Sequence, residues 1–132
     1  MTVEPRIFEG GCHCRAVRFA VTVRELVAYD CNCSVCRMKG FLHLIVEPSD
    51  FVLHRGSENL REYRFNTGVA VHKFCATCGI HSFYTPRSHP NSVDVNVYCL
   101  DGVETSALFE VAPFDGQNWE ASISGLPGST SS

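Results

Sequence analysis

The apolar residues of this chain fall into short runs in which apolar and polar positions alternate. Val93, Val95 and Val97, for example, alternate with polar residues, which is the period of a β-strand with one buried face. Turn sequences rich in Pro, Gly, Asn and Ser separate the runs and favour hairpins. The pattern predicts a mainly β fold of short antiparallel sheets, with strands within 15–23, 41–47, 50–56, 60–65, 69–74, 80–85 and 92–100.

Signals for helices are few. Residues 34–40 favour a single helical turn that ends at Gly40. Residues 114–126 favour a short helix, with Asp115 as a possible N-cap and Gly125 as the stop. We therefore expect little helix in the fold.

Length and composition fit one globular domain. The 132 residues are 45% hydrophobic and 19% charged, values typical of a globular domain that buries roughly two-thirds of its surface on folding. No linker interrupts the predicted strands. We expect one domain over residues 1–126 and a frayed tail over residues 127–132.

The charge pattern and the lengths of the apolar runs each exclude one class of partner. The formal net charge is −3, and the arginines are scattered among acidic residues, so the sequence predicts no nucleic-acid partner. No apolar run has the length of a signal-peptide core or a membrane span. The sequence predicts a cytoplasmic protein with no membrane partner.

Eight cysteines carry the clearest chemical signal. Seven of them stand in close groups and Cys99 stands alone. A reducing cytoplasm disfavours four disulfides, and a chain of this length can build a core without them. Metal binding is therefore the leading interpretation and disulfides are the alternative. The groups are Cys12 with Cys14, Cys31 with Cys33 and Cys36, and Cys75 with Cys78.

Two of the groups are pairs from remote parts of the chain, which suits one tetrahedral zinc site. A C-x-x-C turn aims two thiolates at one ion, and Gly79 after the second cysteine permits the positive φ that such a turn favours. A site of this kind would cross-link two hairpins and secure the fold. Its predicted ligands are Cys12, Cys14, Cys75 and Cys78.

The third group supplies three thiolates from a single loop: Cys31, Cys33 and Cys36. A zinc ion with three protein ligands keeps one coordination position open, as catalysis requires. Alternatively, Cys99, His43 or His72 closes the site and both ions are structural. Iron in place of zinc is a further alternative. Arg37 is a candidate for neutralising the thiolate charge.

Through these motifs the chain resembles the glutathione-dependent formaldehyde-activating family, which includes the centromere protein V domain. The resemblance implies an Mss4-like β domain with the same division into four and three cysteines. The activity it implies is condensation of glutathione with formaldehyde to S-(hydroxymethyl)glutathione, formally a carbon–sulfur lyase reaction. The matching segments are GGCHCRAVRF (10–19), DCNCSVC (30–36), FCATCGIHSFYTPRS (74–88) and VNVYCLD (95–101).

The resemblance implies a zinc-dependent enzyme with two zinc ions per chain. An open zinc at Cys31, Cys33 and Cys36 would ionise the sulfur of glutathione or another thiol, or polarise formaldehyde or a related small aldehyde. Further candidates for substrate contacts are Arg87, whose fork suits a carboxylate, together with Tyr84, Asn96 and His72.

The remaining aromatic and histidine residues have structural assignments, and one non-catalytic function competes with the enzyme. Phe74 and Phe83 are expected in the core, and His13 and His81 beside the zinc-binding turns or on the surface. The rival is a non-catalytic, zinc-stabilised protein-interaction module. It requires that a fourth protein ligand, most simply Cys99, closes the three-cysteine site.

Overall fold

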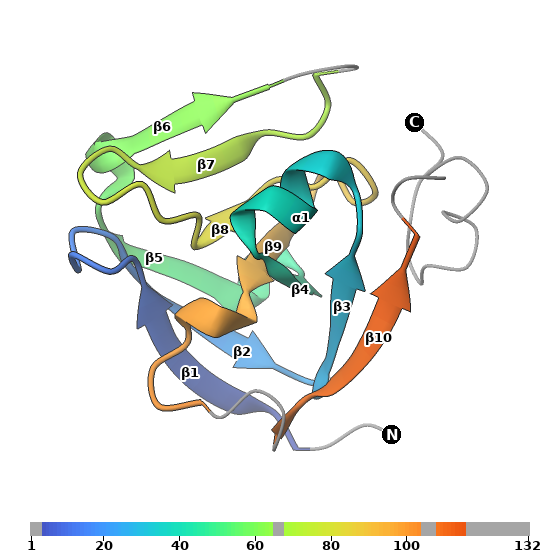
Figure 1. Cartoon of the computed structure of the whole chain (residues 1–132). Helices are drawn as coiled ribbons and strands as arrows, with labels where there is room; N and C mark the ends of the chain where they lie inside the picture. The colour runs from blue at the N-terminus through green and yellow to red at the C-terminus, as the bar shows by residue number, and fades with distance from the viewer. Residues whose placement is uncertain (1–3, 65–67, 104–107, 116–132) are drawn as a thin grey trace.

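The computed structural model describes residues 4–64, 68–103 and 108–115. This part of the chain is mainly β, as predicted, with one short α-helix, α1 (Ser34–Lys39), and three 3-10 turns, η1 (Pro48–Asp50), η2 (Ser57–Asn59) and η3 (Val97–Cys99) (Figure 1). The strands are β1 (Arg6–Gly11), β2 (Arg18–Val23), β3 (Val27–Cys31), β4 (Leu42–Val46), β5 (Phe51–Arg55), β6 (Leu60–Tyr63), β7 (His72–Cys75), β8 (Phe83–Tyr84), β9 (Val93–Asn96) and β10 (Glu110–Phe114).

The strands form three sheets. One has the order β1-β2-β5, a second has the order β10-β3-β4-β9-β8, and β6 pairs with β7. All pairs are antiparallel except β3 with β10, which returns from late in the chain to lie parallel to β3 (Figure 1). The sheets are therefore short and antiparallel, as predicted, apart from this one parallel pair.

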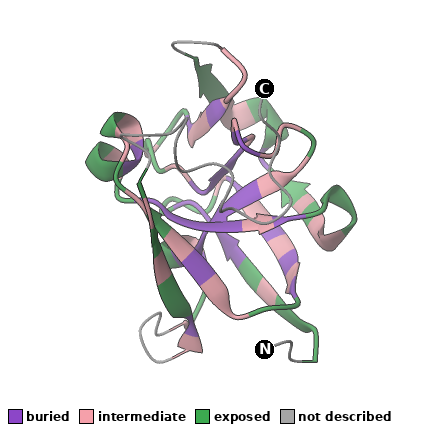
Figure 2. Ribbon diagram, turned by 90° about the vertical axis from the view of Figure 1, so that its right-hand side faces the viewer, coloured by how far each residue is buried: buried purple, intermediate pink, exposed green. Residues whose placement is uncertain are grey.

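The hydrophobic core lies between the first two sheets. Buried positions alternate with partly buried or exposed ones along several strands (Figure 2). Phe19 of β2 is fully buried, and its ring centroid lies 5.1 Å from that of Phe51 and 5.9 Å from that of Phe83. Burial of one such side chain contributes roughly 1.5–3 kcal/mol to folding. Phe83 is a core residue, as predicted, whereas Phe74 is only half-buried.

The second face of the five-stranded sheet is also buried, and it carries polar residues. The register places His43 opposite Asn96 and Asp94 opposite Tyr84, and all four side chains are buried. The expectation that residues 92–100 have only one buried face is therefore wrong. Helix α1 covers part of this polar face, because Lys39 Nζ lies 4.2 Å from the centroid of the Tyr84 ring.

Three strands were missed by the periodicity of the sequence: β1, β3 and β10. β1 ends in two glycines that pack too closely for a side chain, since a Cβ on Gly11 would lie 2.0 Å from the carbonyl oxygen of Val17. β10 contains Pro113 and lies at a sheet edge, where proline is tolerated. A search for period-2 alternation detects neither a strand that ends in glycines nor an edge strand that contains proline.

The two helix predictions have different outcomes. The turn predicted at 34–40 is α1, which ends at Gly40 with φ +66°. Phe114, the first residue of the other predicted helix, is the last residue of β10. The rest of that segment beyond residue 115, and the predicted tail at 127–132, lie outside the described residues. In the described part of the chain, no helix has the length and apolar character needed to cross a membrane.

Candidate metal centre

Four thiols from remote parts of the chain meet beside the ends of β1 and β7. Their Sγ atoms all lie within 4.8 Å of one another, and Cys14 Sγ is 3.6 Å from the Sγ atoms of both Cys12 and Cys75. In a tetrahedron with Zn–S bonds of about 2.3 Å the sulfur atoms are about 3.8 Å apart. The donor set and its spacing therefore suit a four-coordinate zinc ion. The group is the one that the spacing predicts: Cys12, Cys14, Cys75 and Cys78.

Polar hydrogens surround the sulfur of Cys75. It accepts hydrogen bonds from the Asn59 side-chain amide (3.2 Å) and from the backbone N–H groups of Thr77 (3.4 Å) and Cys78 (3.5 Å). Burial raises the pKa of Cys75, but these backbone donors and the neighbouring thiols bring it down to about 6. Gly79 follows the pair with φ +77°, as expected. The turn is thus built to stabilise a thiolate.

The remaining three clustered thiols lie around the start of α1. Cys31 ends β3, Cys33 is the N-cap of α1, and Cys36 is buried in the helix. Their Sγ atoms also lie within 4.8 Å of one another. Hydrogen bonds from the thiols of Cys31 and Cys36 hold the pKa of Cys33 far below its ordinary value. The same contacts raise the pKa of the other two thiols. Hydrogen bonds among the three thiols thus favour a negative charge on the group, as metal binding requires.

The structure separates the predicted fourth ligands from this three-thiol group. Cys99 Sγ donates to the carbonyl oxygen of His81 (3.9 Å). Burial raises its pKa to about 12, and the charges that act on it are those of Cys12 and Cys78. Within residues 4–64, 68–103 and 108–115, neither Cys99 nor a histidine joins the three thiols at ligand spacing. The group offers three protein ligands.

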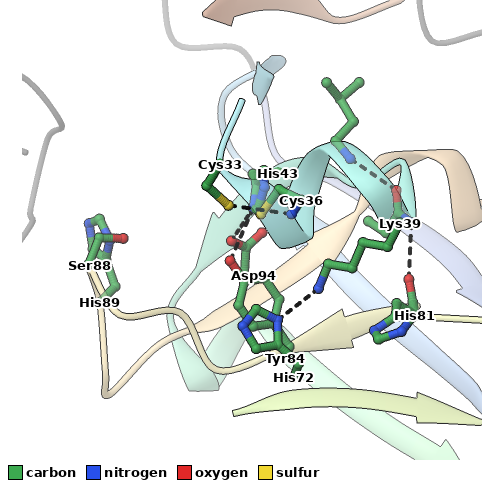
Figure 3. Close-up of polar contacts among 12 residues, drawn as sticks. Cys33, Cys36, Lys39, His43, His72, His81, Tyr84, Ser88, His89 and Asp94 are labelled. Atoms are coloured by element: carbon green, nitrogen blue, oxygen red, sulfur yellow. Dashed lines mark hydrogen bonds and ion pairs between the residues drawn. The ribbon is translucent and has the colours of Figure 1, made fainter. Parts of the chain in front are cut away.

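A half-buried lysine, Lys39, extends from the helix that carries Cys36 (Figure 3). Lys39 Nζ donates to His72 Nδ1 (3.0 Å) and lies over the rings of Phe41 and Tyr84, 4.6 and 4.2 Å from their centroids. Burial lowers the pKa of Lys39, and the charges of the nearby thiols and of Asp94 offset only part of this effect. Lys39 is therefore positioned to balance the thiolate charge, whereas Arg37, the residue we expected in that role, is exposed.

The sequence analysis did not identify Lys39 or Asp94. Lys39 follows Cys36 by three residues, and that spacing on a helix places both residues on one face. This spacing could have identified Lys39 from the sequence. Asp94 occupies the alternating polar position of a predicted strand, which usually indicates a solvent-facing residue. Asp94 is buried because tertiary contacts, including those of the neighbouring strands β4 and β8, cover this face.

The proposed substrate contacts have different surroundings. Tyr84 is buried, and burial raises its pKa well above the ordinary value. Asn96 accepts hydrogen bonds from the backbone N–H groups of Leu42 and Tyr98 and donates to the carbonyl oxygen of His81. Arg87 is half-buried in the segment between β8 and β9. The charges of the three clustered thiols act on Tyr84, and Asn96 ties several backbone segments together.

An open cleft of about 550 Å³ lies between the four-thiol group and the end of α1. Lys39 and Gly40 border one part of it, and Cys12, Arg15 and Tyr98 border another. Arg18 also lines the cleft, but it is paired with Asp101. Arg15 is exposed, so its guanidinium can meet an anionic ligand in the cleft.

The buried histidine next to Lys39 predicts a specific loss of stability in acid. Burial, with the charges of Lys39 and His81, lowers the pKa of His72 to about 4. The unfolded chain takes up this proton near pH 6.5, so stability falls as pH drops from about 6.5 to about 4. We expect His72→Gln to lose less stability than wild type between about pH 7 and about pH 5.

Urea unfolding of zinc-loaded protein at the two pH values measures this effect. Wild type and variant share the acid protonation of the zinc ligands, so the difference between them isolates His72. His54→Gln is the matched control, because the His54 side chain is 45% exposed. Equal losses in His72→Gln and wild type would show that His72 does not sense the pH.

Together, the fold and the site define a small, mainly β protein with two cysteine groups that could hold metal ions. The family model for the glutathione-dependent formaldehyde-activating enzyme matches residues 7–114. The chain belongs to this family, which confirms the resemblance seen in the sequence.

A solved structure supports the same assignment. The chain is similar to a crystal structure of a Rhodobacter sphaeroides protein, with 43% sequence identity and a TM-score of 0.69. The match covers 80% of this chain and 97% of that one. The likeness therefore extends over most of this chain.

Proposed function

We propose that the protein is a zinc-dependent enzyme of the carbon–sulfur lyase type. Its substrates would be glutathione, or another thiol, and formaldehyde or a related small aldehyde. The observation that carries this proposal is the three-thiol group at Cys31, Cys33 and Cys36, which offers three ligands and no fourth among the described residues. Membership of the formaldehyde-activating family supports the choice of substrates.

The two thiol groups would have different tasks. A zinc ion held by the four-thiol group would cross-link the turns after β1 and β7 and stabilise the fold. A zinc ion held by the three-thiol group would supply Lewis acidity and lower the pKa of a bound thiol. Both donor sets are all-sulfur, and thiolate ligands favour zinc or iron over hard cations.

The residues around the three-thiol group would prepare the reaction. Hydrogen bonds from the neighbouring thiols lower the pKa of Cys33, which would favour the thiolate form that binds a metal ion. Lys39 would offset the negative charge of the thiolates from the adjacent helical turn. The buried rings of Phe41 and Tyr84 would exclude water, which strengthens electrostatic interactions at the site. Addition of a thiol to an aldehyde needs little more than an ionised sulfur held close to the carbonyl carbon.

The open cleft would bind the rest of the thiol substrate. Lys39 lines this cleft and lies one helical turn, about 5 Å along the axis, from Cys36. Arg15 lies along the same cleft and would pair with a substrate carboxylate. A substrate such as glutathione, with two carboxylates, would then extend from the three-thiol group into the cleft.

Arg15→Gln tests this binding mode. We expect the KM for glutathione to rise about 2- to 5-fold with little change in kcat, because an exposed ion pair contributes up to about 1 kcal/mol. Steady-state kinetics over a range of glutathione concentrations gives both constants. Arg24→Gln is the control, since Arg24 binds Asp50 and does not line the cleft. An unchanged KM in Arg15→Gln would place the substrate elsewhere.

Exchange spectroscopy tests the proposed function itself. Glutathione and formaldehyde interconvert with S-(hydroxymethyl)glutathione, and NMR measures the rate of this exchange with and without protein. We expect zinc-loaded wild type and Cys99→Ser, which keeps all seven clustered thiols, to accelerate the exchange. A rate that stays at the protein-free value at every concentration of zinc-loaded protein would refute the assigned substrates.

A further inference from the structure

A buried histidine–carboxylate pair lies on the polar face of the five-stranded sheet. His43 Nδ1 donates to Asp94 Oδ2 at 2.6 Å, and the two side chains are 6% and 1% exposed. They come from neighbouring strands, β4 and β9, where His43 lies directly opposite Asn96 and diagonally opposite Asp94. Two antiparallel strands thus fix the position of the pair.

The carboxylate determines which ring nitrogen of His43 is available for other contacts. Because Nδ1–H donates to Asp94, the lone pair of the neutral imidazole lies on Nε2. Nε2 is buried and has no hydrogen-bond partner among the described residues. A buried polar atom without a partner is costly to a fold, so this arrangement favours a role in binding a substrate group.

The histidine faces the three-thiol group without belonging to it. His43 lies opposite Tyr29 of β3, and Cys31 lies two residues further along that strand, so the side chains of all three point to one face of the sheet. A positive charge on His43 would lower the pKa of Cys33, so the two groups lie within electrostatic reach of each other, and Figure 3 draws both side chains in the same part of the site. Nevertheless, no ring nitrogen of His43 reaches ligand spacing to all three thiols.

We propose that His43 is a catalytic residue that moves the proton in this reaction, and that Asp94 is the residue that positions it; this inference rests on the proposed function. In the direction of addition, Nε2 accepts the proton that leaves the substrate sulfur. The sulfur electron pair forms the bond to the carbonyl carbon, and the C=O π pair moves to oxygen. Nε2–H then returns the proton to that oxygen and gives the hydroxymethyl thioether.

The same step in reverse cleaves the adduct. Nε2 takes the hydroxyl proton, the C=O bond forms again, the C–S bond breaks, and the sulfur regains the proton. No electron is gained or lost in either direction, and no further reactant is needed. The role suits a neutral histidine, because it must first accept the proton and later donate it.

Three variants test the proposal. We expect His43→Gln to lower kcat by about 10²- to 10⁴-fold with little change in KM, while two zinc ions per chain remain bound. We expect Asp94→Asn to lower kcat by about 10- to 100-fold, the usual effect of losing a partner that orients a functional histidine. The double variant should be no slower than His43→Gln, because residues that act as a unit are not additive.

Zinc content, circular dichroism and a control variant separate catalysis from structure. His54→Gln changes an exposed residue of β5, and this variant should match wild type in kcat. A His43→Gln protein that keeps two zinc ions and a kcat within about 3-fold of wild type would overturn the inference, as would additive losses in the double variant. Loss of zinc in His43→Gln would also overturn it, by making His43 a metal ligand. If wild type itself fails to accelerate the exchange, the proposed function fails first.

Discussion

Cys75→Ser is expected to unfold the protein or to make its folding depend on a large excess of metal. The Cys75 side chain is buried and lies among Cys14, Cys78 and the amide of Asn59. Structural zinc binding contributes about 10–16 kcal/mol in zinc-finger peptides, which is comparable to the total stability of an ordinary domain, about 5–15 kcal/mol. Loss of even part of this binding energy is enough to unfold a chain of this size.

Circular dichroism during thermal unfolding, with zinc content by mass spectrometry, measures this outcome. Cys99→Ser is the matched control, because Cys99 lies outside both thiol groups and its substitution removes one sulfur while leaving all seven clustered thiols in place. We expect the control to melt cooperatively near wild type with two zinc ions bound. A Cys75→Ser protein that melts at the same temperature would show that the four-thiol group does not secure the fold.

Cys33→Ser is expected to abolish activity and leave the fold in place. Serine is a preferred N-cap residue, so α1 should still begin at Ser34, where the thiol of Cys33 now accepts the N–H of Cys36. The variant loses one of the three thiols that would hold the zinc ion. The three-thiol group should then lose its zinc, while the four-thiol group keeps its own.

Zinc content and the NMR exchange rate report on Cys33→Ser together. We expect one zinc ion per chain, an unchanged circular dichroism spectrum and an exchange rate equal to that without protein. If Cys33→Ser unfolds as completely as Cys75→Ser, the two groups do not divide structure from catalysis. If it retains wild-type activity, the reaction does not take place at the three-thiol group.

The thiol groups were predictable because their chemistry is local. The spacings of Cys12 with Cys14 and of Cys75 with Cys78 indicate chelating turns, and the pairing of these two turns follows from the four ligands that zinc needs. The structure brings the same four sulfur atoms together. Alternation likewise predicted most strands, since period 2 is a local property of the chain.

The surroundings of the three-thiol group depend on contacts between remote segments. Arg37 was chosen because it adjoins Cys36, but neighbouring residues on a helix point in different directions, and the cation beside the group is Lys39. The alternation predicts a solvent-facing position for Asp94, but α1 and the neighbouring strands bury it. Alternation in the sequence shows that the two faces of a strand differ in polarity. It cannot show that both faces are buried.

The division into one closed and one open metal site is most directly tested by anomalous diffraction at the zinc absorption edge from crystals of the zinc-loaded protein. We predict two zinc positions per chain. The first should have four cysteine ligands, Cys12, Cys14, Cys75 and Cys78. The second should have Cys31, Cys33 and Cys36 and a fourth ligand that does not come from the protein. A single zinc position, or a protein side chain completing the second site, would contradict this account.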